Sequence, residues 1–384
     1  MRNVHCLNSI SKVGLNELPK TYQIHNDIQF ADAVLVRSAV MHEIKLSDSV
    51  LAVARAGAGV NNIPLDDYAK QGVVVFNTPG ANANAVKELS IAGMLLASRD
   101  IKGGMNWIDQ NKGTPEIAKT VEKVKAQFGG TEIFNKSIGI IGLGAIGIML
   151  AKACHALGMK VYGTKRNLES LQGEDLPKDM ILVKSKEELF PHCDFISLNL
   201  PLSADTKQMI DKKALNQMKD GVIIINFARD ALVHDLDLKE AIETKKVRKY
   251  VTDFPNDITA NMEGVIAIPH LGASTEEAEE NCAFMAVNQI VEYIENGNIT
   301  NSVNFPDINV DKKNAPHRVT LLYDAKIDIH DKVHPYFSKK DVVQCVDRKN
   351  SKYGYTIVDM NDELNLDLIK AIQKIEGIFK IRVI

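Results

Sequence analysis

The sequence predicts an α/β protein that contains two parallel sheets and ends in a smaller α+β domain. Two observations lead to this class. Over about the first 300 residues, short apolar runs alternate with segments of helical period, and such alternation is typical of parallel sheets covered on both faces. Over about the last 70 residues the order becomes strand, helix, two strands, helix and strand, which is that of a ferredoxin-like sandwich.

The first hundred residues contain three apolar runs that predict buried strands, at Ala33–Val36, Leu51–Ala54 and Val73–Phe76. The segment Asn82–Ala97 has helical spacing of its apolar residues. Between Lys102 and Gln127 the periodicity weakens, so we expect a connection or surface element there.

From Ile138 onwards the pattern becomes sharper. A strand at Ile138–Ile141 precedes a helix at Ile146–Leu157, and Gly158 suits the left-handed residue that ends a helix. A long helix is expected at Thr275–Asn296. The other strands predicted in this part are Lys160–Gly163, Asp194–Leu198, Val222–Asn226, Lys249–Thr252 and Val265–Ala267. The elements expected in the C-terminal part are Arg318–Tyr323, Asp328–Phe337, Val342–Asp347, Tyr353–Val358, Leu366–Ile375 and Phe379–Val383.

Composition limits the function classes. The 384 residues are 45% hydrophobic and 25% charged, as in an ordinary soluble protein. The net charge of −3 argues against nucleic-acid binding, which needs a basic surface. No apolar stretch approaches the roughly 18 residues of a membrane helix, and the N-terminus lacks the pattern of a secretory signal. We therefore expect a cytoplasmic protein without nucleic-acid or membrane partners.

The cysteines and histidines predict neither disulfides nor a metal site. The five cysteines are odd in number, widely spaced and free of any C-x-x-C pair, which favours a reducing compartment. His330 and His334 are four residues apart, but no acidic or cysteine partner is obvious. We expect them on a solvated helix face.

A glycine-rich motif indicates a dinucleotide site. Gly142, Gly144 and Gly147 follow the strand Ile138–Ile141 and open a helix. In this pattern the first glycine permits a tight turn, the second lets the backbone approach a pyrophosphate, and the third lets the helix pack against the sheet. With Ala145 and Ile146, these glycines would hold the pyrophosphate at the helix N-terminus.

The residues that choose between NAD and NADP remain open at this point. An acidic residue about 20 positions on usually binds the adenine ribose. Here Lys165 and Arg166 occupy that region, and cations bind the 2′-phosphate of NADP well. Alternatively, both side chains point to solvent and the protein uses NAD.

Several segments together resemble the D-2-hydroxyacid dehydrogenases, and among them the D-3-phosphoglycerate dehydrogenases most closely. These segments are 55–62, 129–132, 197–202, 225–229 and 268–275. The resemblance covers nearly the whole chain. It implies a flavodoxin-like substrate domain at 1–97 plus 277–305 and a Rossmann-type NAD(P) domain at 98–276. It also implies oxidation of 3-phospho-D-glycerate to 3-phosphohydroxypyruvate, the first step of phosphorylated L-serine biosynthesis, by a homodimer or homotetramer.

Hydride transfer from a hydroxy acid needs a base, a cation for the carboxylate, and an acidic group that holds the base in position. His270 follows a strand, and histidine titrates near neutral pH, so it is the candidate base. Arg229 closes another strand and can bind a carboxylate through two parallel hydrogen bonds.

The acidic group is harder to assign. The family shows a glutamate after a D-V-F-x-x-E run, and alignment through Phe254 gives Asp257 this place. Glu263 is the reserve. The resemblance gives Asp253 contact with the nicotinamide carboxamide, although Asp253 is one residue out of register.

The resemblance also implies the remaining contacts. Further cofactor contacts would be Leu200, Pro201, Phe227, Ala228 and Gly272. Substrate contacts would be Arg37, Ser38, Arg55, Ala58, Gly59 and Asn82. Arg37 and Arg55 follow predicted parallel strands, whose carboxyl ends are where open α/β sheets bind ligands.

Residues 317–384 resemble an ACT domain, a regulatory and oligomerisation module of amino-acid metabolism. The loop that binds serine in such dehydrogenases usually contains histidine, asparagine and proline. Here it runs from Tyr323 to Asp328 without them, so we expect weak or no serine inhibition.

Two alternatives to the phosphoglycerate reaction remain. One is a glyoxylate or hydroxypyruvate reductase, and the other is a non-catalytic protein that senses NAD(H).

Overall fold

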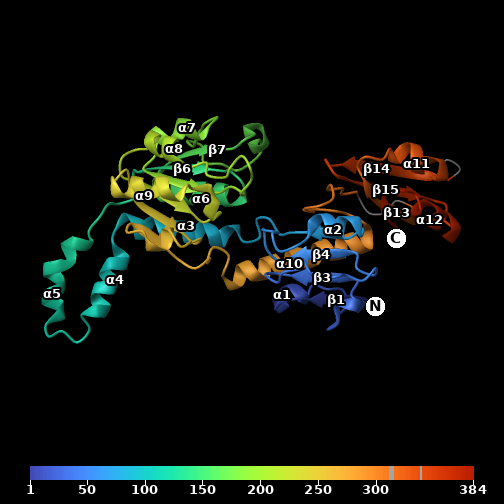
Figure 1. The fold of residues 1–384 in the computed structure, drawn as a ribbon, viewed down its shortest axis with the longest axis horizontal. Helices are drawn as coiled ribbons and strands as arrows, with labels where there is room; N and C mark the ends of the chain where they lie inside the picture. The colour runs from blue at the N-terminus through green and yellow to red at the C-terminus, as the bar shows by residue number, and fades with distance from the viewer. Residues whose placement is uncertain (311–314, 338–339) are drawn as a thin grey trace. The chain divides into compact units, whose positions relative to one another are not determined.

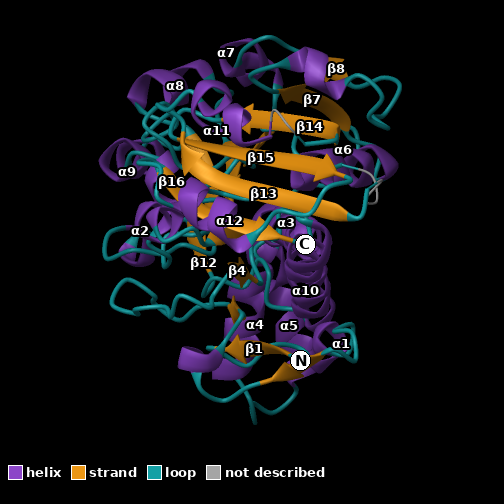
Figure 2. Cartoon of the chain, turned by 90° about the vertical axis from the view of Figure 1, so that its right-hand side faces the viewer, coloured by secondary structure: helices purple, strands orange, loops and turns teal. Residues whose placement is uncertain are grey.

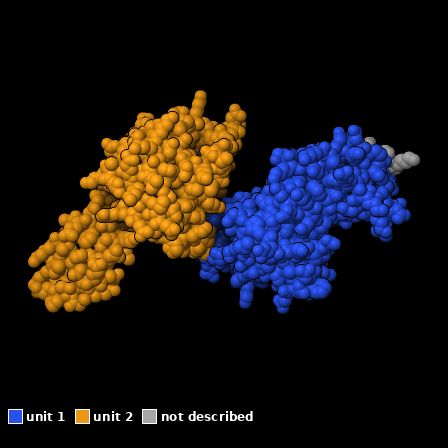
Figure 3. Space-filling model, viewed as in Figure 1, with its two compact units in different colours: residues 1–82, 276–384 blue, residues 83–275 orange. Residues whose placement is uncertain are grey.

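The computed structural model describes residues 1–310, 315–337 and 340–384. The chain forms two compact units (Figure 3). Unit 1 contains Met1–Asn82 and Glu276–Ile384, and unit 2 contains Ala83–Thr275. Within the described ranges, no helix is long and apolar enough to cross a bilayer.

The first sheet of unit 1 is parallel, with the strand order β2-β1-β3-β4-β5. This is the flavodoxin-like order. Its strands are β1 (Arg2–Cys6), β2 (Tyr22–Ile24), β3 (Ala33–Val36), β4 (Ala52–Arg55) and β5 (Val74–Phe76). Short helices α1 (Lys12–Leu15) and α2 (Leu65–Lys70) connect them.

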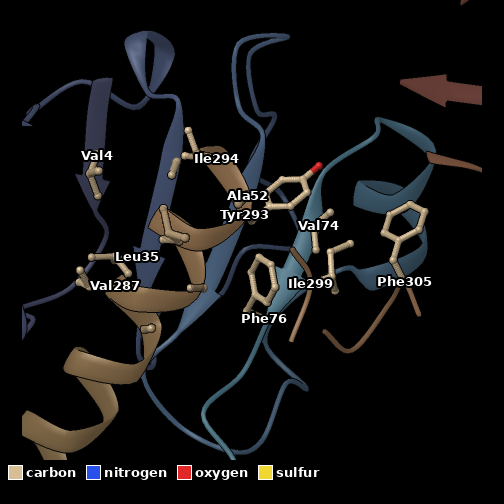
Figure 4. Packing of buried hydrophobic residues seen from close by; sticks show 14 of the residues in the cluster. Val4, Leu35, Ala52, Val74, Phe76, Val287, Tyr293, Ile294, Ile299 and Phe305 are labelled. Carbon is tan, nitrogen blue, oxygen red and sulfur yellow. The ribbon is translucent and has the colours of Figure 1, made fainter. Parts of the chain in front are cut away.

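Helix α10 (Glu276–Asn296) packs against this sheet through a stripe of buried residues at helical spacing. Figure 4 shows Val287, Tyr293 and Ile294 of α10 among Leu35 and Ala52 of the sheet. The contribution of α10, which follows unit 2 in the chain, makes unit 1 discontinuous in sequence.

Unit 2 is built on a parallel seven-stranded sheet with the order β12-β11-β10-β9-β6-β7-β8. The six strands from β11 to β8 have the Rossmann order, and β12 extends it. The strands are β6 (Ser137–Ile141), β7 (Lys160–Thr164), β8 (Ile181–Leu182), β9 (Phe195–Leu198), β10 (Val222–Asn226), β11 (Val247–Thr252) and β12 (Val265–Ala267). The helices between them are α6 (Ala145–Ala156), α7 (Lys186–Leu189), α8 (Lys212–Gln217) and α9 (Asp235–Glu243).

Helix α3 (Ala83–Ser98) belongs to unit 2, whereas the sequence placed the boundary after residue 97. The helix packs on α6, β10 and β11, and Gly93 allows this approach, because a Cβ there would lie 3.1 Å from Val251. After it, α4 (Ile101–Gln110) and α5 (Ile117–Val124) form a helical hairpin that projects from the rest of unit 2 (Figure 1). The sequence predicted a connection or surface element in this region.

The C-terminal part of unit 1 is an antiparallel sheet with the order β14-β15-β13-β16 (Figure 2). Its elements follow in the predicted βαββαβ order: β13 (His317–Asp324), α11 (Ile329–Phe337), β14 (Val342–Lys349), β15 (Tyr353–Met360), α12 (Leu366–Gln373) and β16 (Ile378–Val383). The side chain of His334 lies outside the described part of the chain. The predicted class, parallel α/β sheets followed by an antiparallel α+β sheet, is therefore confirmed.

The central strands β13 and β15 of this antiparallel sheet are buried on both faces, whereas most of the edge strand β14 is exposed. One face packs on α11 and α12 through residues such as Leu321 and Val358. The other packs on α10, where buried Arg318 donates to Asp359 at 2.6 and 2.7 Å and to the carbonyl oxygen of Asn296. The C-terminal sheet therefore closes the end of α10.

Candidate active site

The three glycines of the turn after β6 have different surroundings. Gly142 has a φ of 100°, and a Cβ there would lie 2.4 Å from the carbonyl oxygen of Asn199. A Cβ on Gly147 would lie 2.1 Å from the carbonyl oxygen of Gly142, so α6 packs tightly on the turn. Among residues 1–310, 315–337 and 340–384, no atom lies within 4 Å of the Cβ position of Gly144. The space over Gly144 is therefore open to an anion at the N-terminus of α6, as a bound dinucleotide pyrophosphate requires.

The sheet order brings most cofactor candidates to one edge. Strands β6, β9, β10 and β11 are parallel, and each hydrogen-bonds to the next in this order. Their carboxyl ends carry, in turn, the glycine turn, Leu200 with Pro201, Phe227 with Ala228, and Asp253. This edge is the ligand-binding edge of an open α/β sheet.

The end of β7 carries Lys165, which is half-buried, and Arg166, which is exposed. Arg166 donates to Asp205 at 2.9 Å, and both side chains are at least 74% exposed. An exposed pair of this kind is weak, so a phosphate group can displace Asp205 from Arg166.

A buried asparagine shapes the turn that carries Arg229. Asn226 is fully buried at the end of β10. Its Nδ2 donates to the carbonyl oxygen of Arg229 and to the hydroxyl of Tyr250, and its Oδ1 accepts from the backbone N–H groups of Ala228 and Arg229. This side chain therefore fixes the backbone of the turn at Arg229.

Phe254 links the two candidate catalytic residues. Its ring centroid lies 4.4 Å from that of His270, and the guanidinium carbon of Arg229 lies 5.6 Å from the same ring. The first is an aromatic pair and the second a cation–π contact, and both favour the observed positions of the two side chains. Sequence reasoning used Phe254 only as an alignment anchor, because spacing alone does not show that one ring contacts both residues.

The loop that carries His270 is held by the end of β11. The backbone N–H of His270 donates to the carbonyl oxygen of Asp253 at 2.9 Å, and that of Gly272 donates to Asp253 Oδ2 at 2.8 Å. His270 is exposed and has a φ of 22°, an unusual value for a residue with a side chain. The two bonds to Asp253 hold the loop in this conformation.

Asp253 is a buried carboxylate with one unused oxygen. Asp253 is 1% exposed, and within the described part of the chain its Oδ1 has no hydrogen-bond partner. Burial raises the pKa of Asp253, while the N–H of Gly272 and the charges of His270 and Arg229 lower it. An unsatisfied buried acceptor is costly and fits a donor supplied from outside the chain, such as a nicotinamide carboxamide, or the imidazole N–H of His270.

Asp257 and Glu263 are placed differently. Both line a hollow of about 400 Å³ that α9 borders. Among the described residues, neither makes a hydrogen bond or ion pair with His270. Asn256 fixes this loop, because its Nδ2 donates to Asp230 and Asp235. Of these three acidic residues, Asp253 is the one whose hydrogen bonds hold the loop of His270.

The candidate substrate residues lie in unit 1 at the carboxyl ends of β3 and β4. Asn8 Oδ1 accepts from the backbone N–H groups of Arg37, Ser38 and Ala39 at 3.0 to 3.1 Å. Arg55 Nε donates to the carbonyl oxygen of Arg37 at 2.9 Å, and its guanidinium also donates to Gly59. Arg37, Arg55 and Gly59 therefore come together.

The remaining substrate candidates are Ala58, which precedes Gly59, and Asn82. The carbonyl oxygen of Ala58 accepts from Asn77 Nδ2 at 2.6 Å. Asn82, half-buried, is the last residue of the N-terminal segment of unit 1.

Comparisons with known proteins agree with this chemistry. A family model described as D-isomer specific 2-hydroxyacid dehydrogenase, NAD binding domain, matches residues 91–272. A D-3-phosphoglycerate dehydrogenase of Haemophilus influenzae is 28% identical, over 89% of this chain and 83% of that protein. A hydroxypyruvate reductase of Thermotoga maritima is 32% identical, over 67% of this chain and 83% of that protein.

Among solved structures, an NAD⁺-bound 3-phosphoglycerate dehydrogenase of Entamoeba histolytica matches with a TM-score of 0.62 and 27% identity, covering 79% of this chain and 98% of that chain. The chain spans about half the length of other curated D-3-phosphoglycerate dehydrogenases that it matches, such as 54% of that from Methanocaldococcus jannaschii. With a glycine turn for a dinucleotide and Arg229 and His270 around Phe254, the chain belongs to the D-isomer-specific 2-hydroxyacid dehydrogenase family and is an NAD(P)-dependent oxidoreductase.

Proposed function

We propose that the protein is a D-3-phosphoglycerate dehydrogenase. It would oxidise 3-phospho-D-glycerate to 3-phosphohydroxypyruvate and so begin phosphorylated L-serine biosynthesis. The observation that carries this proposal is the pair Arg37 and Arg55 at neighbouring strand ends, because a phosphorylated substrate needs cations beyond the catalytic arginine. The similarity to curated D-3-phosphoglycerate dehydrogenases supports the same substrate.

His270 is the proposed base that takes the proton of the substrate hydroxyl. Arg229 binds the substrate carboxylate and polarises the reacting C–O bond, since a guanidinium donates two parallel hydrogen bonds. The nicotinamide cofactor, when bound, accepts the hydride. Asp253 stabilises protonated His270, a role supported by its burial and its unused Oδ1.

Asp253 was also the expected acceptor for the nicotinamide carboxamide, and that role stays a prediction, as does the partnership of Asp257 with His270. The two roles of Asp253 differ in their readouts. Loss of a carboxamide contact raises the KM for the cofactor, whereas loss of an imidazole contact changes the pH profile of kcat.

The second candidate function is reduction of hydroxypyruvate or glyoxylate, which the similarity to the Thermotoga maritima reductase favours. The deciding experiment is spectrophotometric turnover of 3-phosphohydroxypyruvate, hydroxypyruvate and glyoxylate, each with NADH and with NADPH. We expect the highest kcat/KM with 3-phosphohydroxypyruvate. A preference for an unphosphorylated acid would establish the reductase instead, and no turnover at all would indicate a sensor.

Arg55→Ala gives a second test of the substrate. It should raise the KM for 3-phosphohydroxypyruvate much more than the KM for hydroxypyruvate, because only the first carries a phosphate. Equal effects on the two would contradict phosphate binding at Arg55.

We further propose that residues 317–384 are an ACT-like module with weak or no serine inhibition, supported by the βαββαβ order. Millimolar L-serine that halves the activity would overturn this.

We propose a homodimer or homotetramer that associates through the α4–α5 hairpin, whose Met105 is 62% exposed. A cytoplasmic location is supported by five free cysteines.

A further inference from the structure

Arg37 is paired with a carboxylate at the candidate substrate site. Its Nη2 lies 2.6 Å from Oε1 of Glu279, and the two side chains are 39% and 41% exposed. Asn8 fixes the backbone of Arg37, so the guanidinium extends from a rigid loop. The pair is therefore accessible to solvent.

Glu279 comes from a different part of the chain. It lies in the first turn of α10 together with Glu276 and Glu277, where the helix dipole stabilises negative charge. One turn further on, Cys282 is buried, and the charges of both Arg37 and Arg55 lower its pKa while burial raises it. The first turns of α10 therefore adjoin both arginines.

A phosphate group and Glu279 would compete for Arg37. A phosphate monoester offers more negative charge and more acceptor oxygens than a carboxylate, and binds a guanidinium through two hydrogen bonds. A half-exposed ion pair contributes only about 0 to 1 kcal/mol, so phosphate can displace the glutamate. A substrate without phosphate gains nothing from this exchange.

We propose that Glu279 is a specificity-determining residue that occupies Arg37 until the phosphate of a substrate replaces it. This inference rests on the proposed function for the identity of that substrate. Glu279 lowers the affinity of Arg37 for any ligand phosphate that binds there. When an unphosphorylated hydroxy acid is bound, Glu279 keeps the charge of Arg37 neutralised.

The test compares Glu279→Gln with a matched control, Glu277→Gln. Both changes remove one charge from the same turn of α10, but Glu277 is exposed and forms no ion pair with any residue that the structure describes. The ratio of the KM for 3-phosphohydroxypyruvate to the KM for hydroxypyruvate should fall about two- to fivefold in the Glu279 variant, because a half-exposed ion pair contributes up to about 1 kcal/mol. In the control it should stay within twofold of the wild type.

Inorganic phosphate gives a readout that does not depend on the proposed function. Its inhibition constant, measured with whichever 2-keto acid the wild type reduces, should fall about two- to fivefold in Glu279→Gln. In an Arg37→Gln background the Glu279 change should have no effect beyond that of Glu277→Gln, because Glu279 acts through Arg37.

The outcomes are separable. Failure of the wild type to reduce 3-phosphohydroxypyruvate would remove the proposed function, while the phosphate measurement would still decide the role of Glu279. A phosphate inhibition constant that is unchanged or higher in Glu279→Gln would overturn the inference. An effect that persists without Arg37 would overturn it as well.

Discussion

Replacement of Phe254 by leucine tests whether this ring positions the catalytic pair. Leucine retains an apolar side chain of similar size but has no π-face. The variant loses the ring contact with His270 at 4.4 Å and the cation–π contact with Arg229 at 5.6 Å. Both side chains should then occupy a wider range of positions, and fewer of these suit proton transfer and carboxylate binding.

The expected magnitude comes from these two contacts. An aromatic pair contributes about 0.5 to 1.5 kcal/mol, and a cation–π contact at an exposed site about 0.5 to 1 kcal/mol. If the variant loses this whole restraint in the transition state, roughly 1 to 2.5 kcal/mol, kcat falls roughly 5- to 70-fold at 1.36 kcal/mol per tenfold.

The assay is steady-state kinetics in both reaction directions, with circular dichroism to confirm folding. Phe190→Leu is the control, because Phe190 is fully buried in a different cluster of unit 2. The control should lose some stability and keep its kcat. A Phe254→Leu enzyme whose kcat lies within twofold of this control would refute the positioning role of the ring.

Three further predictions address the acid, the glycine turn and the C-terminal sheet. Asp253→Asn should lower kcat and move the acid limb of the oxidation profile to lower pH; a limb that moves only in Asp257→Asn would instead make Asp257 the partner of His270. Burial raises the pKa of Asp253, so the same variant should unfold at a higher temperature at neutral pH, and this gain should vanish below the ordinary aspartate range. Gly144→Ala should reduce NAD affinity about tenfold or more without loss of stability. Gly147→Ala should reduce both NAD affinity and thermal stability, as measured by titration and scanning calorimetry. Arg318→Met leaves a buried carboxylate unpaired and should cost about 3 to 5 kcal/mol, measured by hydrogen exchange in β13 and β15.

The glycine turn could be predicted because its geometry depends on adjacent residues. A buried strand, a turn that excludes side chains and an amphipathic helix follow one another within about twenty residues. The structure places β6 at Ser137–Ile141 and α6 at Ala145–Ala156, each within one residue of the expected bounds. The short strands β1 and β2 were not predicted, because RNVHC and YQI contain polar residues and form no continuous apolar run.

The role that we propose for Asp253 beside His270 could not be predicted in this way. Spacing from Phe254 gives Asp257 the expected position, and nothing local distinguishes it from Asp253. The distinction comes from burial and from bonds across the fold. Asn256 binds two aspartates that precede and begin α9, while Gly272 donates to Asp253 from another loop. An alignment contains none of these contacts.

The pairing of the arginines could not be predicted from the sequence either. The sequence offers cations where anionic ligands should bind, but it does not show which of them are already paired. Arg37 is paired with Glu279 and Arg166 with Asp205, and both pairs are exposed enough for phosphate to displace the acid. Arg318 is also paired, but it and Asp359 are each 1% exposed, so that pair serves the fold. The accessibility of the paired acid, rather than the number of arginines, therefore decides which cation can bind a ligand. By this criterion Arg37, whose competing acid comes from α10, is where a change of one carboxylate should alter the choice between phosphorylated and unphosphorylated substrates.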